Sequence, residues 1–541
     1  MFKANQNHYQ QTLSDSTQWM NTKILTKLEK TWAPIFYEHV FRKIDEEPFA
    51  ILYSTTGKPN FPVNILLSLE YIKHMKNCSD LELLDDFYFD YLVNYAVGIR
   101  SLGEKNLAER TLYYFRQRIY QYSIDNPGKD DILFGQFINL LNNFARESGI
   151  SLEEQRTDTT LFMSNIKKAG RLSLAFDVLV KAVKAIPEEK LTDSLSKVLE
   201  PRFKTDVLYH AKQQEGDSKL TLLLNLCKEA LVILEAQPNM LKSEEVRIVK
   251  RFLSEQSTTE ADSEKLIPMP SKEIPSGSLQ SAYDEDATFR RKGNVSQSGY
   301  VLEISETCGK ENPFQLITDY AVEPNNISDV EIFTERVEII HENTNCTDMY
   351  VDGGFYSEDV NQAAEENDIE IHFTNMSGTE PKKKLPVTEF DIDDTTNLIN
   401  RCPGGYIPTH VGIGGGQTTA HFPHEACSNC EFRDQCFSKE QVKDNVVRIT
   451  LKAVNASRDR VVMKANKKEN TSKRAGIEGS NSALKRKGQA KLNVRGKAKS
   501  KVISGLKVTG QNITRFIKYL QGGYKPKTDT PLYGISVPNF N

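Results

Sequence analysis

The order of apolar segments between residues 299 and 376 constrains the fold more than any other feature of this 541-residue chain. SGYVLEISETC and PFQLITDYAVEP favour two strands, because they are rich in β-branched and aromatic residues. A helical pattern from Ser328, a short strand ending at Asp352, a second helix and the strand IEIHFTNM follow. Two strands, helix, strand, helix, strand is the order of an α/β unit around a mixed sheet.

Two acidic residues occupy notable places in this pattern. Asp352 ends a predicted strand, and functional residues of such sheets gather at the carboxyl ends of strands. Asp158 lies within QRTDTTLFMS, which is rich in Thr and apolar residues and favours another strand. Structural interpretations compete with both: Asp-Gly-Gly is an ordinary turn, and Asp158 with Thr159 is a common helix cap.

A third acid, Glu478, lies in the basic stretch KRAGIEGSNSALKRK at residues 473–487. If this stretch is one helix, Arg474 four residues before and Lys485 seven residues after share its face. A carboxylate on a basic face can bind a divalent cation while the cations hold a phosphodiester backbone. The alternative is a solvated basic helix with an incidental Glu.

Charge is distributed unevenly along the chain, although the net charge is only −4. Residues 441–520 contain 21 Lys and Arg against 4 Asp and Glu, whereas residues 341–400 contain 3 Lys against 14 acids. A C-terminal region this basic implies a polyanionic partner. The first residues, MFKANQNHYQQ, lack the apolar run of a signal peptide, and no stretch reaches the ~18 apolar residues of a membrane span. We therefore expect a cytoplasmic protein.

Four of the eight cysteines cluster in the sequence: Cys402, Cys427, Cys430 and Cys436. Such a set can supply the closed thiolate site of structural Zn²⁺, with His421 and His424 as substitutes, and free thiols are the alternative. The cluster belongs to one of six predicted segments, assigned from periodicity and composition. They are a helical domain (1–150), a strand with a helical insertion (151–257), a linker (258–280), an α/β core (281–378), a Cys-rich insertion (379–445), and a helix with a basic tail (446–541).

Together, the three acids resemble those of the DDE transposases of bacterial insertion sequences. Asp158 in RTDTTLF looks like the family's first acid, Asp352 in YVDGGFYS like its second and Glu478 like its third. Arg474-x3-Glu478-x6-Lys485 matches the signature of one large branch of the family. That signature usually begins with Tyr, and this chain has Thr471 at the corresponding position. Asp284 and Asp286 in SAYDEDATF are alternative candidates for the first acid. The reason is that the helical segment between Asp158 and the next strand is a larger interruption than the family's core without insertions has.

The resemblance implies an RNase H-like α/β core and a Mg²⁺- or Mn²⁺-dependent reaction. Asp158, Asp352 and Glu478 would bind the metal ions, and Arg474, Lys485, Arg486 and Lys487 would bind DNA. The enzyme would cut the element's ends and join them to target DNA, as a homodimer in a synaptic complex and without a membrane partner. Two other classes compete: a metal-dependent nuclease without strand transfer, and a non-catalytic zinc-containing DNA-binding protein.

Overall fold

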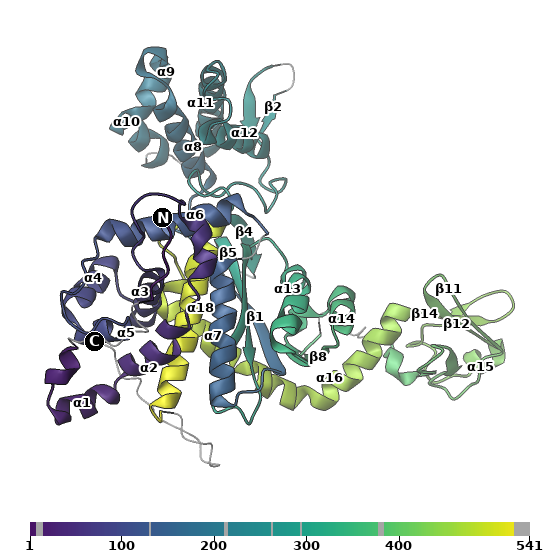
Figure 1. Cartoon of the computed structure of the whole chain (residues 1–541). Helices are drawn as coiled ribbons and strands as arrows, with labels where there is room; N and C mark the ends of the chain where they lie inside the picture. The colour runs from purple at the N-terminus through teal and green to yellow at the C-terminus, as the bar shows by residue number, and fades with distance from the viewer. Residues whose placement is uncertain are drawn as a thin grey trace. The chain divides into compact units, whose positions relative to one another are not determined.

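The computed structural model describes residues 1–6, 15–128, 131–209, 215–260, 263–292, 295–376 and 384–523 (Figure 1). The end of the predicted basic tail, residues 524–541, lies outside this range, as do residues 377–383 around the start of the predicted Cys-rich insertion. The chain divides into two compact units. The first contains residues 1–346 and 477–541, and the second contains residues 347–476. Both contain helices and strands, so the chain is mixed α/β.

An antiparallel sheet forms the centre of the first unit. The strand β1 (Glu154–Phe162) pairs with the second half of β5 (Val295–Thr307), which also pairs with β6 (Ile317–Pro324), while β4 (Thr288–Lys292) pairs with the first half of β5. Gly299 lies where β5 passes from β4 to β1, and a Cβ there would meet the Phe162 carbonyl oxygen at 2.4 Å. The sequence indicated β1, β5 and β6 but not β4, which follows the residues interpreted as the end of a linker.

Helices from both ends of the chain cover one face of this sheet. Seven come from the N-terminal region: α1 (Thr22–Glu29), α2 (Trp32–His39), α3 (Val63–Lys76), α4 (Asp80–Phe89), α5 (Tyr91–Ala96), α6 (Glu109–Asp125) and α7 (Ile132–Ser148). The C-terminal helix α18 (Lys497–Leu520) runs among α2, α3, α6 and α7 (Figure 1). Leu302 and Ile304 of β5 join Phe144 and Phe516 in one hydrophobic core, so the N-terminal helices and α18 are stabilised together.

The other face of the sheet is covered by α13 (Asp329–Thr344), which begins as predicted at the N-cap Ser328. Its Ile332 packs against Val301 of β5 and Ala321 of β6. Alternate residues of each strand therefore point into different layers, as the pleat requires.

The predicted helical insertion has a hydrophobic core of its own, which includes Leu179, Leu223 and Phe252. It contains α8 (Arg171–Ala185), α9 (Asp193–Ser196), α10 (Pro201–Lys204), α11 (Gly216–Glu235) and α12 (Glu244–Gln256). The following residues 258–280, predicted as a linker, contain part of an antiparallel pair, β2 (Ser257–Thr259) with β3 (Leu266–Pro268). Asn225 of α11 hydrogen-bonds both main-chain groups of Leu266.

The second unit contains two groups of strands. The parallel strands β7 (Asp348–Val351) and β8 (Glu370–Phe373) are connected through α14 (Glu358–Glu365), which completes the predicted order of strands and helices. The Cys-rich region contains β9 (Asp391–Ile392), β10 (Ile399–Arg401), β11 (His410–Gly414), β12 (Gln417–Phe422), α15 (His424–Ser428), β13 (Lys439–Glu440) and β14 (Asn445–Thr450). Four of these strands form a sheet in the order β11-β12-β14-β13.

The basic stretch predicted as one helix is interrupted. The helix α16 (Leu451–Ala475) ends at Gly476, and α17 (Ile477–Leu484) begins directly after it. From Lys485 the chain continues as the π-helical turn η11 (Lys485–Gln489), in which Gly488 takes a φ of 82°. The stretch from Arg474 to Lys485 is therefore not one continuous α-helix, because Gly476 separates α16 from α17 and a π-helical turn begins at Lys485. Within the described ranges, no helix is both long and apolar enough to cross a membrane.

Candidate active site

Asp158 lies at the middle of β1, against which α17 packs. Asn481 of α17 donates a hydrogen bond from Nδ2 to Asp158 Oδ2 over 3.3 Å. Glu478 precedes Asn481 by one helical turn and is exposed, while Asp158 is partly exposed. The fold therefore brings Asp158 together with the helix that carries Glu478, although 320 positions separate the two acids in the numbering. The helix-cap interpretation of Asp158 is excluded, since the next helix begins at Arg171.

A buried carboxylate, that of Glu306, holds α17 in this position. Glu306 is fully buried in β5 and accepts hydrogen bonds from Arg156 of β1, Ser480 of α17 and Arg515 of α18. Arg515 also donates to Ser480 Oγ over 2.5 Å. Burial alone would raise the pKa of Glu306, but Arg515, Arg156 and Ser480 lower it. The carboxylate therefore remains ionised and links two strands with two helices.

Asp352 follows β7 directly in the second unit and also caps a turn. Its Oδ1 accepts a 2.7 Å hydrogen bond from the Gly354 N–H, and its Oδ2 lies 3.8 Å from Arg474 Nη2. Gly353 is required there, because a Cβ would lie 2.9 Å from the Asn375 carbonyl oxygen. The turn interpretation is thus correct as local structure, and the turn places the carboxylate beside an arginine.

Five basic side chains were singled out in the stretch around Glu478, and they differ in their surroundings. Lys473 donates to the Tyr350 hydroxyl over 2.7 Å and lies over the same ring. Lys485 and Arg486 are exposed, whereas Lys487 is half-buried. Burial and repulsion from neighbouring cations lower the pKa of Lys487 to about 8.

The competing first acids, Asp284 and Asp286, lie in the turn before β4. Asp284 is buried, and both of its oxygens are occupied: Oδ1 accepts from the Tyr300 hydroxyl at 2.5 Å, and Oδ2 from the Gly496 N–H at 3.0 Å. Asp286 is exposed and accepts from the Lys497 N–H over 2.9 Å. Asp284 therefore joins the start of α18 to the sheet.

A group of potential metal ligands that sequence reasoning missed lies on β7 and β8. Ligand atoms of Asp348, Glu370 and His372 lie within 4.8 Å of one another. His372 Nε2 is 2.8 Å from Asp348 Oδ1, and its ring stacks on Tyr350. Burial raises the pKa of Asp348, but hydrogen bonds from His372 and Thr347 outweigh it and lower the pKa. Only the parallel register, in which Asp348 opposes Glu370, brings these residues together, and the sequence carries no signal for it.

The four clustered cysteines line one small cavity of about 20 Å³. All four are free thiols, and three of them pack on the same hydrophobic cluster as Phe422 and Val447. Burial raises the pKa of Cys427, and the other three thiols add to that rise while Arg433 opposes it. The two histidines considered as substitutes are engaged elsewhere, His421 with Asp444 and His424 with Asn445.

Two family models match two different stretches of the chain. A model described as a transposase DDE domain matches residues 401–517. A model described as a transposase domain, DUF772, matches residues 26–118. Both matches are to transposase domains, which confirms the predicted resemblance to an insertion-sequence DDE transposase.

The two matched stretches lie toward opposite ends of the chain. Glu478 lies within the DDE match, whereas Asp158 and Asp352 lie outside both matches. No curated protein and no solved structure matches the chain.

Proposed function

We propose that the protein is a DNA transposase that cuts the ends of its element and joins the freed 3′-hydroxyls to target DNA. The observation that carries the proposal is the packing of α17, the helix that carries Glu478 of the matched DDE segment, on β1, the strand that carries Asp158. The order of β1, β5, β6, α13, β7, α14 and β8 also agrees with an RNase H-like core. Two ends are joined to one target, so we further propose that a homodimer assembles the synaptic complex.

In this proposal the ligands of two Mg²⁺ or Mn²⁺ ions are the carboxylates of Asp158, Asp352 and Glu478. The donor set fits the group, because carboxylate oxygens are the preferred ligands of hard divalent cations and none of the three acids is fully buried. Bound metal ions would activate the attacking oxygen and stabilise the leaving oxygen. Arg474, whose Nη2 lies 3.8 Å from Asp352 Oδ2, would orient that carboxylate and would also bind a phosphate of the DNA.

The reaction consists of two displacements at phosphorus. Water attacks the phosphodiester at the end of the element, the P–O3′ bond breaks and the 3′-oxygen takes up a proton. The new 3′-hydroxyl then loses its proton, attacks a target phosphodiester in line and releases the 3′-hydroxyl of the target strand. Lys485, Arg486 and Lys487 would hold the flanking phosphates, since Lys and Arg neutralise the DNA backbone.

A structural Zn²⁺ in the Cys-rich region is the second part of the proposal. Cys402, Cys427, Cys430 and Cys436 line one cavity and form no disulfide among the described residues, and four thiolates form a closed tetrahedral site. Gly404 supports this reading, because a Cβ there would lie 2.9 Å from Cys430 Sγ and would obstruct the thiol. The metal would stabilise a region that has only a small hydrophobic core.

The proposal is tested with labelled DNA containing the element's ends, a target plasmid and Mg²⁺. Asp158→Asn, Asp352→Asn and Glu478→Gln are expected to abolish both cleavage and joining while DNA binding persists. Asp286→Asn is the matched control, because the hydrogen bond of this exposed acid among the described residues comes from the Lys497 main chain, and it is expected to remain active. Cleavage without joining would favour a nuclease, and DNA binding without cleavage by the unchanged protein would refute the enzymatic proposal.

A further inference from the structure

Two lysines near the C-terminal end of α18 have no acidic partner in the part of the chain that the structure describes. Lys487 of η11 donates from Nζ to Thr514 Oγ1 of α18 over 3.4 Å, and Lys518 lies one turn after Thr514. Both lysines are half-buried. A third lysine, Lys507 of α18, donates from Nζ to the Lys487 carbonyl oxygen.

The charges around Lys487 are all of one sign. Burial is the main cause that lowers its pKa to about 8, and repulsion from Lys518, Arg515 and Lys507 adds to it. Arg515 is compensated by Glu306, but the ion pairs within the described residues include none for Lys487, Lys507 or Lys518. Apolar side chains at these positions would make the folded protein more stable. Buried lysines without an acidic partner are therefore expected mainly at functional sites.

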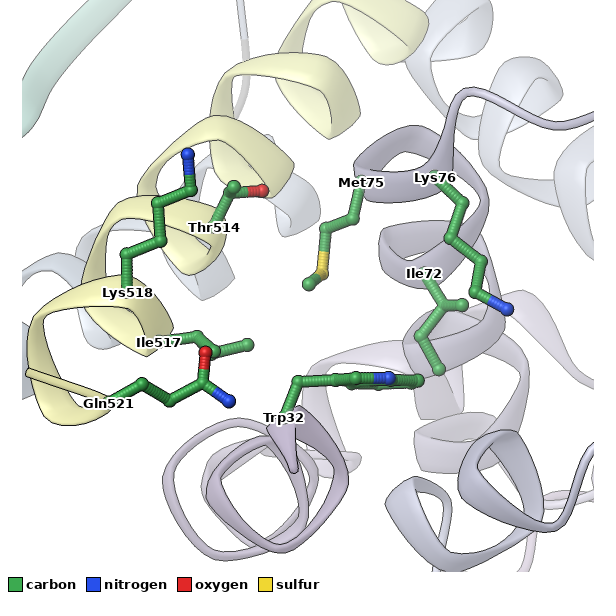
Figure 2. A pocket seen from close by; sticks show the side chains of 8 residues that line it. All are labelled: Trp32, Ile72, Met75, Lys76, Thr514, Ile517, Lys518 and Gln521. Carbon is green, nitrogen blue, oxygen red and sulfur yellow. The ribbon is translucent and has the colours of Figure 1, made fainter. Parts of the chain in front are cut away.

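A small cavity of about 30 Å³ lies beside this group of lysines. Figure 2 shows Thr514 and Lys518 of α18 on one side, Met75 and Lys76 of α3 on the other, and Trp32 of α2 between the two helices. The floor is apolar and the rim is cationic. Lys76 is already neutralised by Asp86 and Asp90, so Lys518 contributes the uncompensated charge on this rim.

The cavity lies where the two transposase domains meet. Trp32, Met75 and Lys76 belong to the stretch matched by the DUF772 domain, and Lys487 and Thr514 belong to the DDE match. A group bound here would therefore contact both domains at once.

We propose that Lys487 and Lys518 bind a phosphodiester of DNA beside Thr514, with the Trp32 side of the cavity next to the adjoining sugar. A phosphate supplies the missing negative charge, accepts from both ammonium groups and removes the repulsion among the lysines, while the Thr514 hydroxyl donates to the Gly510 carbonyl oxygen. The inference rests on the proposed function, which supplies DNA as the polyanion. It extends the DNA-backbone contacts, proposed above for Lys487, to Lys518 and to the Trp32 side of the cavity.

The test measures DNA binding by the full chain without divalent metal, so its outcome does not depend on catalysis. Lys487→Gln and Lys518→Gln are compared with Lys197→Gln, an exposed lysine of the helical insertion. Each of the first two variants is expected to weaken binding of a DNA duplex about three- to tenfold and to reduce the salt slope by about one. The control is expected to bind like the unchanged protein. Unchanged binding in both pocket variants, or equal losses in the control, would overturn the proposal.

A second measurement uses the fluorescence of Trp32, isolated by Trp19→Phe because the chain has two tryptophans. DNA is expected to change its emission saturably, and this change should be lost in Lys487→Gln and Lys518→Gln. Melting temperatures should not fall in these variants, because each removes a repulsive charge. A response to inorganic phosphate without DNA binding would overturn the assignment to DNA. Loss of DNA cleavage with intact lysine-dependent binding would refute only the proposed function.

Discussion

The buried carboxylate of Glu306 offers the sharpest test of how the fold positions the candidate active site. Glu306→Gln preserves the shape of the side chain but removes its charge. Arg156 and Arg515, whose side chains are 10% and 16% exposed, would then face each other across a neutral amide. The amide can accept at only one end, so either Arg156 or both Ser480 and Arg515 would lose their acceptor.

The expected loss of stability follows from this geometry. Removing one partner of a buried ion pair typically costs ~3–5 kcal/mol, because the other charge is left buried and uncompensated. Two guanidinium groups depend on Glu306, so we expect a loss of about 4 kcal/mol in the free energy of unfolding of the first unit. Since Ser480 lies on α17, DNA cleavage should fall as well.

Urea unfolding followed by tryptophan fluorescence measures this loss, because Trp19 and Trp32 both lie in the first unit. Glu38→Gln is the matched control: its pair with Arg42 is exposed at both ends, and such pairs contribute at most ~1 kcal/mol. A loss below about 1 kcal/mol in Glu306→Gln, or a loss equal to that of the control, would refute the view that this carboxylate holds α17 in place.

Three further outcomes are expected. The lowered pKa of Lys507, about 8 against its usual 10.5, means that the folded state binds fewer protons than the unfolded state between these values. Stability should therefore rise with pH across that window by up to ~3 kcal/mol, and Lys507→Met should abolish this share of the rise in urea unfolding. Cys430→Ser should lower the zinc content of the purified protein, measured by elemental analysis, whereas Cys78→Ser should leave it unchanged. The pKa of Glu306 is lowered, so the stability that its carboxylate contributes should be complete above pH 4.5, its usual pKa, and should be lost as the pH falls below that value. Acid unfolding should therefore depend less on pH in Glu306→Gln than in the unchanged protein.

Local patterns carried most of what could be predicted from the sequence. Ser328 begins a helix as expected, because its side chain accepts a hydrogen bond from the third residue of the helix, which is a short-range effect. The strand around Asp158 was also correct, since its composition and its spacing suit a pleated, half-buried element.

Long-range pairings account for what could not be predicted. Glu306 looks like a surface residue in the sequence, and its partner Arg515 follows it by 209 positions. The cluster of Asp348 with His372 depends on the register of two parallel strands, which no local pattern specifies. The break at Gly476 was missed because glycine weakens a helix without always ending it, and here the boundary between the two units falls at that residue.

The helical insertion also has a consequence for the order in which the chain folds. Phe162 at the end of β1 pairs with Tyr300 of β5. The segment from residue 163 to residue 299, which contains the helical insertion, therefore begins and ends at neighbouring positions of this strand pair. If this segment were an unstructured loop, its closure entropy would slow the pairing of these strands. Because it has its own hydrophobic core, it can collapse first and bring its two ends close together. We therefore expect the insertion to fold as an early unit that shortens the search by which β1 finds β5.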